Sequence, residues 1–331
     1  AGPAGAGPMV HGHIDVIQDV AYNYYGKRIA TCSGDHTVKV YDLLEDGRQT
    51  LTGDFKPHCG SVLRLAWAHP EYGAVLASCS EDSTVEIWEE QVGRATGSEQ
   101  VPSQWGQRAR LTDSRTTIAG IQFAPRQLGL KLATCAKDGQ VRLYEAMDVM
   151  NLSSWSHLED FKVRGKGQCN CLSWNPARGY TMLALGCSSD AKEATNIQVW
   201  ELGGSKRWAP VIDAQFELDA VEVNDVTFAP SMGRGYFLLA AACGDGSVRI
   251  WKIKPTASPG ALAEADHGRQ QRYSVEQILH SDEHGVRVHR VSWNVTGTKL
   301  VSTAEDGSVK LWRTDLLGHW RMSEVPLSEG D

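Results

Sequence analysis

Short runs of alternating hydrophobic and polar residues recur six times along the chain. The first run of each recurrence ends in an aromatic residue, and these runs cover 19–22, 62–67, 118–123, 171–174, 225–228 and 290–293. Most are followed closely by Pro or Gly, as at Pro70, Pro125 and Gly297. Apolar residues at a period of two, bounded by turn residues, predict β-strands. Each recurrence then has a run of small apolar residues, as at 76–79 and 132–135, which predicts a second strand.

A third run closes each recurrence with nearly the same phrase. The six phrases are CSGDHTVKVYD (32–42), CSEDSTVEIWE (79–89), CAKDGQVRLYE (135–145), CSSDAKEATNIQVWE (187–201), CGDGSVRIWK (243–252) and AEDGSVKLWR (304–313). The closing aromatic residues are Tyr41, Trp88, Tyr144, Trp200, Trp251 and Trp312, so the spacing runs from 47 to 61 residues. A loose period with an Asp turn, an alternating strand and a closing aromatic is typical of WD-repeat blades.

The repeats predict an all-β chain, an open six-bladed WD-repeat β-propeller with four-stranded antiparallel blades. We place the repeats at about 13–42, 58–90, 113–145, 169–201, 223–252 and 284–313, within one domain that covers 9–331. The fourth strand of each blade must lie in the variable stretch that follows, including 91–110, 146–168, 203–221 and 255–283. Residues 1–8, AGPAGAGP, are interpreted as a leader or a remnant, with Met9 as the natural start.

The propeller is predicted to be open between its first and last blades. Only four residues of the expected natural sequence precede His13, so no N-terminal strand is available to pair into the sixth blade. Residues 320–325 can supply that blade's own outer strand. Proteins normally cover exposed strand edges, and a strand from a partner can do so. We therefore expect a partner's β-blade at a seam made by Ile14, Val16, Ile17, Val20, Val286, Val288 and Val291.

A His–Ser/Thr–Asp–aromatic set recurs in three of the repeats. The sets are His13, Thr31, Asp35 and Tyr41; His58, Ser78, Asp82 and Trp88; and His284, Ser302, Asp306 and Trp312. These residue types suggest a catalytic triad. However, a single active site would not recur in three blades, and no Gly-x-Ser-x-Gly elbow accompanies any set. We interpret the sets as hydrogen-bonded structural tetrads, in which the indole completes the chain, and expect no catalytic residue. Repeats three to five lack the His, so their blades should be tied less rigidly.

Composition excludes several other classes of function. The 331 residues are 41% hydrophobic and 22% charged, which is ordinary for a globular chain. The net charge is −7 and the sequence has no stripe of basic residues, so direct nucleic-acid binding is not expected. No apolar run is long enough to cross a bilayer. Cys32, Cys79, Cys135, Cys187 and Cys243 occupy nearly the same repeat position, which indicates packing and a reducing compartment. Cys169 and Cys171 form an isolated C-x-C, so we expect neither a metal site nor a cofactor.

Several stretches resemble a known family. Residues 13–42, 62–90 and 113–155, above all APRQLGLKLATC and MDVMNLSSW, resemble the six-bladed WD-repeat nucleoporin of the Y-shaped nuclear-pore scaffold. VSWNVTGTKL at 291–300 adds to the likeness. The first two stretches also fit its sister, the propeller of the outer cage of the COPII vesicle coat. The third stretch is specific to the nucleoporin.

The resemblance implies a non-catalytic scaffold protein that is peripheral to the nuclear envelope. An α-solenoid nucleoporin is expected to insert a β-blade into the open propeller, with other Y-complex nucleoporins as further partners. Support of mRNA and protein transport follows, and a second complex at the vacuolar or lysosomal membrane, upstream of the TOR kinase, is also implied. Two alternatives stay open, a COPII cage propeller and a WD-repeat substrate adaptor such as one of a ubiquitin ligase.

Overall fold

The computed structural model describes residues 12–91, 104–165, 167–188, 196–204, 206–212, 216, 221–256, 272–315 and 318–325. The segment 1–8 and the insertion 191–194 of the fourth repeat lie outside the described residues, as does most of the variable stretch 255–283. Contacts divide the chain into two units. The first comprises Ala1–Lys137 and Arg142–Asp160, and the second comprises Asp138–Val141 and Phe161–Glu329.

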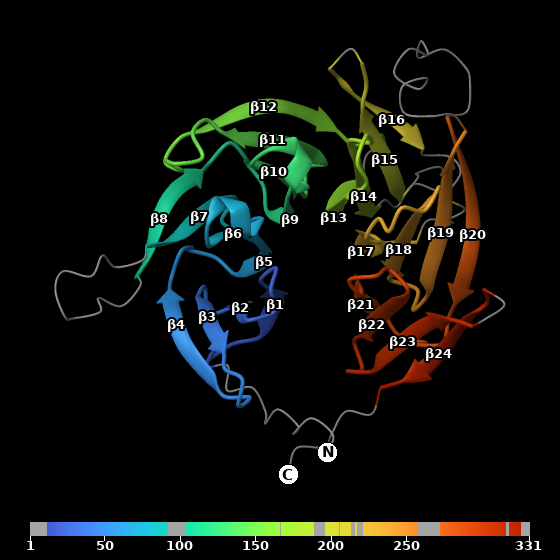
Figure 1. Cartoon of the computed structure of the whole chain (residues 1–331), viewed down its shortest axis with the longest axis horizontal. Coiled ribbons are helices and arrows are strands. Elements are labelled where there is room, and N and C mark those ends of the chain that lie inside the picture. The colour runs from blue at the N-terminus through green and yellow to red at the C-terminus, as the bar shows by residue number, and fades with distance from the viewer. Residues whose placement is uncertain are drawn as a thin grey trace. The chain divides into compact units, whose positions relative to one another are not determined.

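The described residues form six four-stranded antiparallel sheets, each built from consecutive strands of the chain (Figure 1). Blade 1 contains β1 (Ile17–Tyr22), β2 (Arg28–Ser33), β3 (Val38–Leu43) and β4 (Gln49–Phe55). Blade 2 contains β5 (Val62–Trp67), β6 (Val75–Ser80), β7 (Val85–Gln91) and β8 (Gln104–Leu111). Blade 3 contains β9 (Ile118–Phe123), β10 (Lys131–Ala136), β11 (Gln140–Ala146) and β12 (Trp155–Lys162). These blades make up the first unit, apart from the start of β11 and the end of β12.

The second unit holds the other three sheets. Blade 4 contains β13 (Gln168–Trp174), β14 (Met182–Ser188), β15 (Ile197–Leu202) and β16 (Trp208–Ile212). Blade 5 contains β17 (Val223–Phe228), β18 (Phe237–Cys243), β19 (Val248–Pro255) and β20 (Tyr273–Ser281). Blade 6 contains β21 (Val288–Trp293), β22 (Lys299–Ala304), β23 (Val309–Thr314) and β24 (Trp320–Glu324). Two 3-10 turns, η1 (Pro70–Tyr72) and η2 (Arg126–Leu128), lie in the first unit.

The sheets confirm the predicted six-bladed β-propeller of four-stranded antiparallel blades. The outer strand of each blade lies in the variable stretch after its closing phrase, and β24 is the sixth blade's own outer strand, as expected. The inner strands begin two or three residues earlier than the alternation predicts in four blades, for example at Ile17 and Val288. Each inner strand also pairs with its neighbour through a register shift near its start.

Neighbouring blades within a unit share apolar cores. The second strands are small and apolar, and β6 and β18 are buried along their whole length. In the first unit, Ala77 and Cys79 of blade 2 cluster with Ile121 and Leu132 of blade 3. We call the face that a blade turns toward the preceding blade its leading face, and the opposite one its trailing face. Burial of both faces drives the blades together, because no single sheet can bury them alone.

Gly186 of β14 lies where blade 4 packs tightly against its own β13 and against blade 5. A Cβ atom at this position would lie 2.4 Å from the Cys171 sulfur and 2.7 Å from a methyl carbon of Val223. Both distances are below any normal contact, so only glycine lets the two blades meet this closely.

Candidate partner-binding faces

One position of the inner strand distinguishes blade 1 from its counterparts. Leu65, Ile121, Val226 and Val291 occupy this position in blades 2, 3, 5 and 6, and each packs against the preceding blade within its unit. Their exposed fractions are 6%, 7%, 2% and 5%. Val20 holds the same position in blade 1 and is 47% exposed. The leading face of blade 1 therefore presents an apolar contact that the other blades bury.

Further apolar side chains extend the leading face of blade 1. Tyr22 is 60% exposed, and Leu51, which pairs with Tyr41 across β3 and β4, is 49% exposed. At the position of Tyr22, Trp67 in blade 2 and Trp293 in blade 6 each donate an indole N–H to a backbone carbonyl of the preceding blade. Exposed apolar side chains grouped on one sheet face are typical of a binding surface.

The trailing face of blade 6 is the second apolar face. Val301, Val309 and Leu311 lie on it and are partly exposed. Their counterparts in blade 5 are Ala240, Val248 and Ile250, which are fully buried against blade 6. The corresponding residues of blades 1 to 4 are also buried, namely Ala30, Val38, Val40, Ala77, Val85, Ile87, Ala133, Val141, Leu143, Ala184, Ile197 and Val199.

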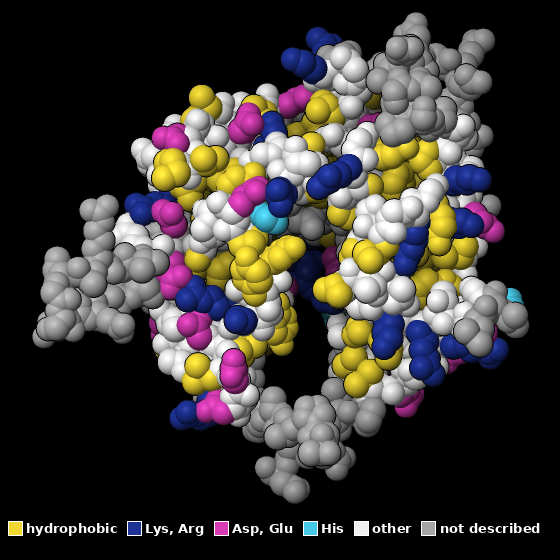
Figure 2. Space-filling view, in the orientation of Figure 1, with side chains coloured by type: hydrophobic (Ala, Val, Ile, Leu, Met, Phe, Trp, Pro, Cys, Tyr) yellow, Lys and Arg dark blue, Asp and Glu magenta, His cyan; other side chains and the backbone are white. Residues whose placement is uncertain are grey.

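Figure 2 shows hydrophobic side chains reaching the surface over β1 in the first unit and over β21 and β22 in the second. Each of the two faces is thus visible by itself as an apolar area on its own unit. Exposed strand faces of this kind invite pairing with another chain unless something covers them.

Four predicted seam residues belong to the start of blade 1. Ile14 and Val16 precede β1 and are 94% and 66% exposed, respectively. Ile17 begins β1 and is partly exposed, and Val20 lies on the leading face described above. The side chain of Val20 is therefore exposed on the leading face of blade 1, and that of Ile17 is partly exposed.

The expectation for blade 6 was wrong at two residues. Val288 and Val291 are 0% and 5% exposed, and they pack against Ala240 and Ala242 of blade 5. The register shift after Val288 turns both valines toward the same face, which an alternating pattern does not reveal. Val286 precedes β21 and is 37% exposed. The exposed residues of this blade, such as Val301, Val309 and Leu311, were missed, although their repeat positions could have identified them.

The polar set of blade 2 is a buried hydrogen-bonded cluster. The Nδ1 atom of His58 lies 3.2 Å from Asp82 Oδ2, and its Nε2 atom lies 2.9 Å from Ser78 Oγ. Thr84, which was not anticipated, contacts the same Nδ1 at 3.0 Å and donates its hydroxyl to Asp82 at 2.7 Å. Trp88 differs from the expectation: its buried indole N–H has no hydrogen-bond partner among the described residues. Its ring stacks on Phe55 of blade 1 instead, at 4.2 Å between centroids.

Blade 6 arranges the same residue types differently. His284 contacts Ser302 Oγ at 2.7 Å and Ser308 Oγ at 2.9 Å, and the Trp312 indole donates to Ser302 at 2.8 Å. Asp306 accepts the backbone N–H of Ser308 at 2.9 Å, and within the described part of the chain no hydrogen bond joins it to His284. The indole thus completes the chain here, whereas the carboxylate does not touch the imidazole.

Blade 1 follows the pattern of blade 2. His13 lies 2.8 Å from Thr31 Oγ1 and 3.1 Å from Asp35 Oδ2. In blade 4 an amide makes the corresponding bonds. Gln198 accepts from the Trp200 indole at 3.2 Å and from the backbone N–H of Arg164, and its side-chain NH2 group donates to the Arg164 carbonyl. The side chains that make these buried hydrogen bonds therefore differ among blades 1, 2, 4 and 6.

The pKa shifts in blade 2 agree with a structural role. Burial lowers the pKa of His58, despite the nearby Asp82 carboxylate, so the ring is held neutral. Burial alone would raise the pKa of Asp82, but hydrogen bonds from Thr84 and from the backbone of Cys59 outweigh it and lower that pKa. Burial also raises the pKa of Glu86 to about 7, although Arg110 lies 3.1 Å away. A neutral, fully bonded histidine whose ring nitrogens both contact fixed groups is not arranged as a general base.

All eight cysteines carry free thiols, and only Cys59 is exposed. Cys169 and Cys171 are buried in β13. Among the residues that the structure describes, no cluster of three or more His, Cys, Asp or Glu side chains could hold a metal ion. Within the same residues, no helix has the length and hydropathy needed to cross a membrane.

Comparison with known proteins identifies the fold and the relatives. The family described as WD domain, G-beta repeat matches residues 8–42, 49–89, 217–252 and 276–313. A solved structure entitled "Crystal Structure of Mitotic Checkpoint Complex" contains a chain that matches with a TM-score of 0.63 at 19% identity, over 90% of this chain and 74% of that one. This likeness concerns the fold alone.

Sequence relatives cover nearly the whole chain. Nucleoporin SEH1 of Homo sapiens and of Bos taurus are each 40% identical to it over 323 residues, which is 96% of this chain and 87% of theirs. Nucleoporin SEH1-A of Xenopus laevis matches with the same identity and the same coverage. The conserved length includes all six blades, and so the chain belongs to the SEH1 family of WD-repeat nucleoporins.

Proposed function

We propose that the protein is a non-catalytic structural scaffold of the nuclear pore, whose blades serve as binding surfaces for other nucleoporins. The observation that carries this proposal is the 40% identity to proteins named Nucleoporin SEH1 over 96% of the chain. The polar sets support it, because each histidine is tied to fixed hydroxyl or carboxylate groups. The same relatives favour a nucleoporin over the COPII cage propeller and the substrate adaptor.

The partner is proposed to cover the two apolar faces with β-strands. The leading face of blade 1 presents Val20 and Tyr22, and the trailing face of blade 6 presents Val301, Val309 and Leu311. Counterparts of these residues inside each unit are covered by another four-stranded blade. A β-blade with apolar side chains is therefore the element whose shape fits either face.

We assign the blade donor to an α-solenoid nucleoporin, following the family resemblance, with other Y-complex nucleoporins as further partners. The protein would then be peripheral to the nuclear envelope at the pore, in support of mRNA and protein transport. Covering both faces should bury well over about 1,600 Å² in total, as permanent complexes do. A second assembly at the vacuolar or lysosomal membrane, upstream of TOR, belongs to the same proposal.

Co-expression with candidate partners tests this function. The chain expressed alone should be poorly soluble, and co-expression with the solenoid nucleoporin should rescue it, because the apolar faces become covered. Affinity purification from cells, followed by mass spectrometry, should recover nucleoporins of the Y complex in stoichiometric amounts. A stable monomer with slow amide exchange in β1 and β23 would contradict the proposal, since both faces would already be protected.

A further inference from the structure

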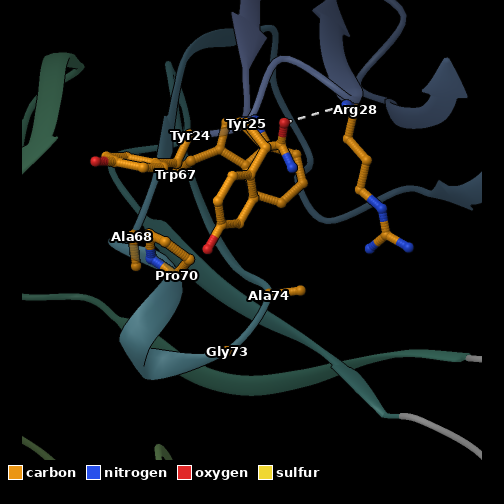
Figure 3. A pocket seen from close by; sticks show the side chains of 9 residues that line it. Tyr24, Tyr25, Arg28, Trp67, Ala68, Pro70, Gly73 and Ala74 are labelled. Carbon is orange, nitrogen blue, oxygen red and sulfur yellow. Dashed lines mark hydrogen bonds between the residues drawn. The ribbon is translucent and has the colours of Figure 1, made fainter.

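A pocket in the first unit lies between blades 1 and 2. The cavity of about 260 Å³ is lined by Asn23, Tyr24, Tyr25, Arg28, Trp67, Ala68, Pro70, Gly73 and Ala74. These residues come from the β1–β2 turn of blade 1 and from the segment of blade 2 between β5 and β6. Figure 3 shows the three aromatic rings together on one side, Pro70 and Ala74 below them, and Arg28 extending along the other side.

The aromatic wall is exposed and held in place before any ligand binds. Tyr24 and Tyr25 are 69% and 66% exposed, and their rings meet edge to face at 5.3 Å. The turn that carries them is fixed by Asn23, whose side chain accepts the backbone N–H groups of Lys27 and Arg28 at 2.9 and 3.1 Å. Tyrosines displayed on an ordered turn cost little entropy on binding, and Tyr, Trp and Arg dominate binding hot spots.

The charges around the pocket favour an uncharged ligand. The Arg28 guanidinium is bonded to Asp42, at 2.7 Å from Nε, and to Glu90. An anionic ligand would be repelled by both carboxylates, which already neutralise the guanidinium. A cationic ligand would meet the Arg28 guanidinium, which lines the cavity, whereas neither Asp42 nor Glu90 is among the lining residues.

The remaining chemistry points to proline. The faces of aromatic rings pack well against the pyrrolidine ring of a proline, and the aromatic residues of the pocket, together with Pro70, offer several such faces. An extended proline segment loses little conformational entropy when it docks, and its carbonyl oxygens can accept from the two exposed phenol groups. We propose that this pocket binds an uncharged, proline-containing extended segment of a partner protein, independently of the blade that covers the apolar faces.

Fluorescence anisotropy of the full chain tests the proposal. The probe is a fluorescein-labelled polyproline peptide of about ten residues, compared with polyalanine and polylysine peptides of the same length. We expect saturable binding of polyproline alone, and a loss of at least about tenfold in affinity for the Tyr24→Ala/Tyr25→Ala variant. Both side chains are exposed, so this variant should keep the circular dichroism of the parent chain.

Tyr22→Ala is the matched control, because Tyr22 is equally exposed but lies on the leading face of blade 1. It should leave polyproline binding unchanged while it weakens co-purification of the solenoid nucleoporin, and Tyr24→Ala/Tyr25→Ala should do the opposite. Equal binding of polyalanine, preferred binding of polylysine, no binding at all, or unchanged binding in the double variant would each overturn the proposal. Failure of the solenoid interaction alone would overturn only the proposed function.

Discussion

Asp19 of blade 1 accepts a hydrogen bond from the backbone N–H of Leu65 in blade 2, at 2.9 Å. Asp225 of blade 5 makes the same bond to Val291 of blade 6, at 3.2 Å. In both places a carboxylate on one inner strand holds the next inner strand at the position where its buried apolar side chain enters the core. In each unit, this bond therefore joins the inner strands of two consecutive blades at the point where their apolar side chains pack.

Asp19→Ala should destabilise the contact between blades 1 and 2. The backbone N–H of Leu65 would stay buried without an acceptor, which costs about 1–3 kcal/mol. Thermal unfolding followed by circular dichroism should show a lower Tm. Asp19→Asn retains an acceptor oxygen and should recover most of the loss. Equal Tm values for Asp19→Ala and the parent chain would show that the bond contributes nothing to stability.

Asp82→Ala should cost more stability than Asp306→Ala. Asp82 accepts from His58, from the Thr84 hydroxyl and from two backbone N–H groups, whereas Asp306 is exposed and accepts from the side chain and the backbone of Ser308. We expect a loss of about 1–3 kcal/mol for Asp82→Ala and a smaller loss for Asp306→Ala.

Urea unfolding of both variants, with hydrolysis of a generic ester as a second readout, tests the structural role of the sets. Any trace hydrolysis should be the same in both variants and in the parent chain. An esterase activity that disappears in Asp82→Ala at unchanged stability would mean that the blade 2 set is catalytic after all.

Much of the fold could be predicted from the sequence, because inner and closing strands have one pattern repeated six times. Each closing phrase overlaps an observed third strand, as with Val38–Leu43 and Val85–Gln91, and all six strands end one to three residues beyond the phrase. The outer strands were located only to within the variable stretches, because these stretches share no pattern that repeats from blade to blade.

The candidate faces were predicted less well. Val288 and Val291 looked available because alternation assigns faces by counting residues, and the bulge between Val288 and Arg290 breaks that count. Trp88 was expected to complete a hydrogen-bonded chain, but its indole ring stacks on Phe55 of the neighbouring blade instead. The first outcome depends on a bulge within blade 6 and the second on a contact between blades 1 and 2, and simple alternation along one repeat encodes neither.

Glu86→Gln should stabilise the protein above neutral pH. Burial raises the pKa of Glu86 to about 7 in the folded chain, above its ordinary value of 4.5. The folded state then holds the proton more tightly, so its stability falls as the pH rises from about 4.5 to about 7. Glutamine carries no charge and removes this loss. The Tm advantage of Glu86→Gln should grow between pH 5 and pH 8, and a constant difference would contradict the shift.

One cysteine of the eight should react quickly in the folded protein. Cys59 is exposed, whereas the other seven thiols are buried, and burial raises the pKa of Cys243 to about 12. A thiol that is buried and protonated is a poor nucleophile. Titration with a disulfide reagent should detect one thiol in the native chain and eight in denaturant, and elemental analysis should find no stoichiometric zinc. Chelator-induced unfolding would contradict this expectation.

Val20→Asp and Leu65→Asp make a matched test of the leading face of blade 1, because the two residues hold the same position in adjacent blades. Val20 is 47% exposed and Leu65 is 6% exposed. Val20→Asp should change the stability of the isolated chain by no more than about 0.5 kcal/mol, whereas Leu65→Asp should cost several times more by burying a charge. Val20→Asp should nevertheless reduce co-purification of the solenoid nucleoporin at least about tenfold, since the carboxylate would lie under the partner's apolar blade. If Val20→Asp binds the partner normally, the leading face of blade 1 is not the binding surface. If it unfolds the free chain as Leu65→Asp does, that face is already covered from within.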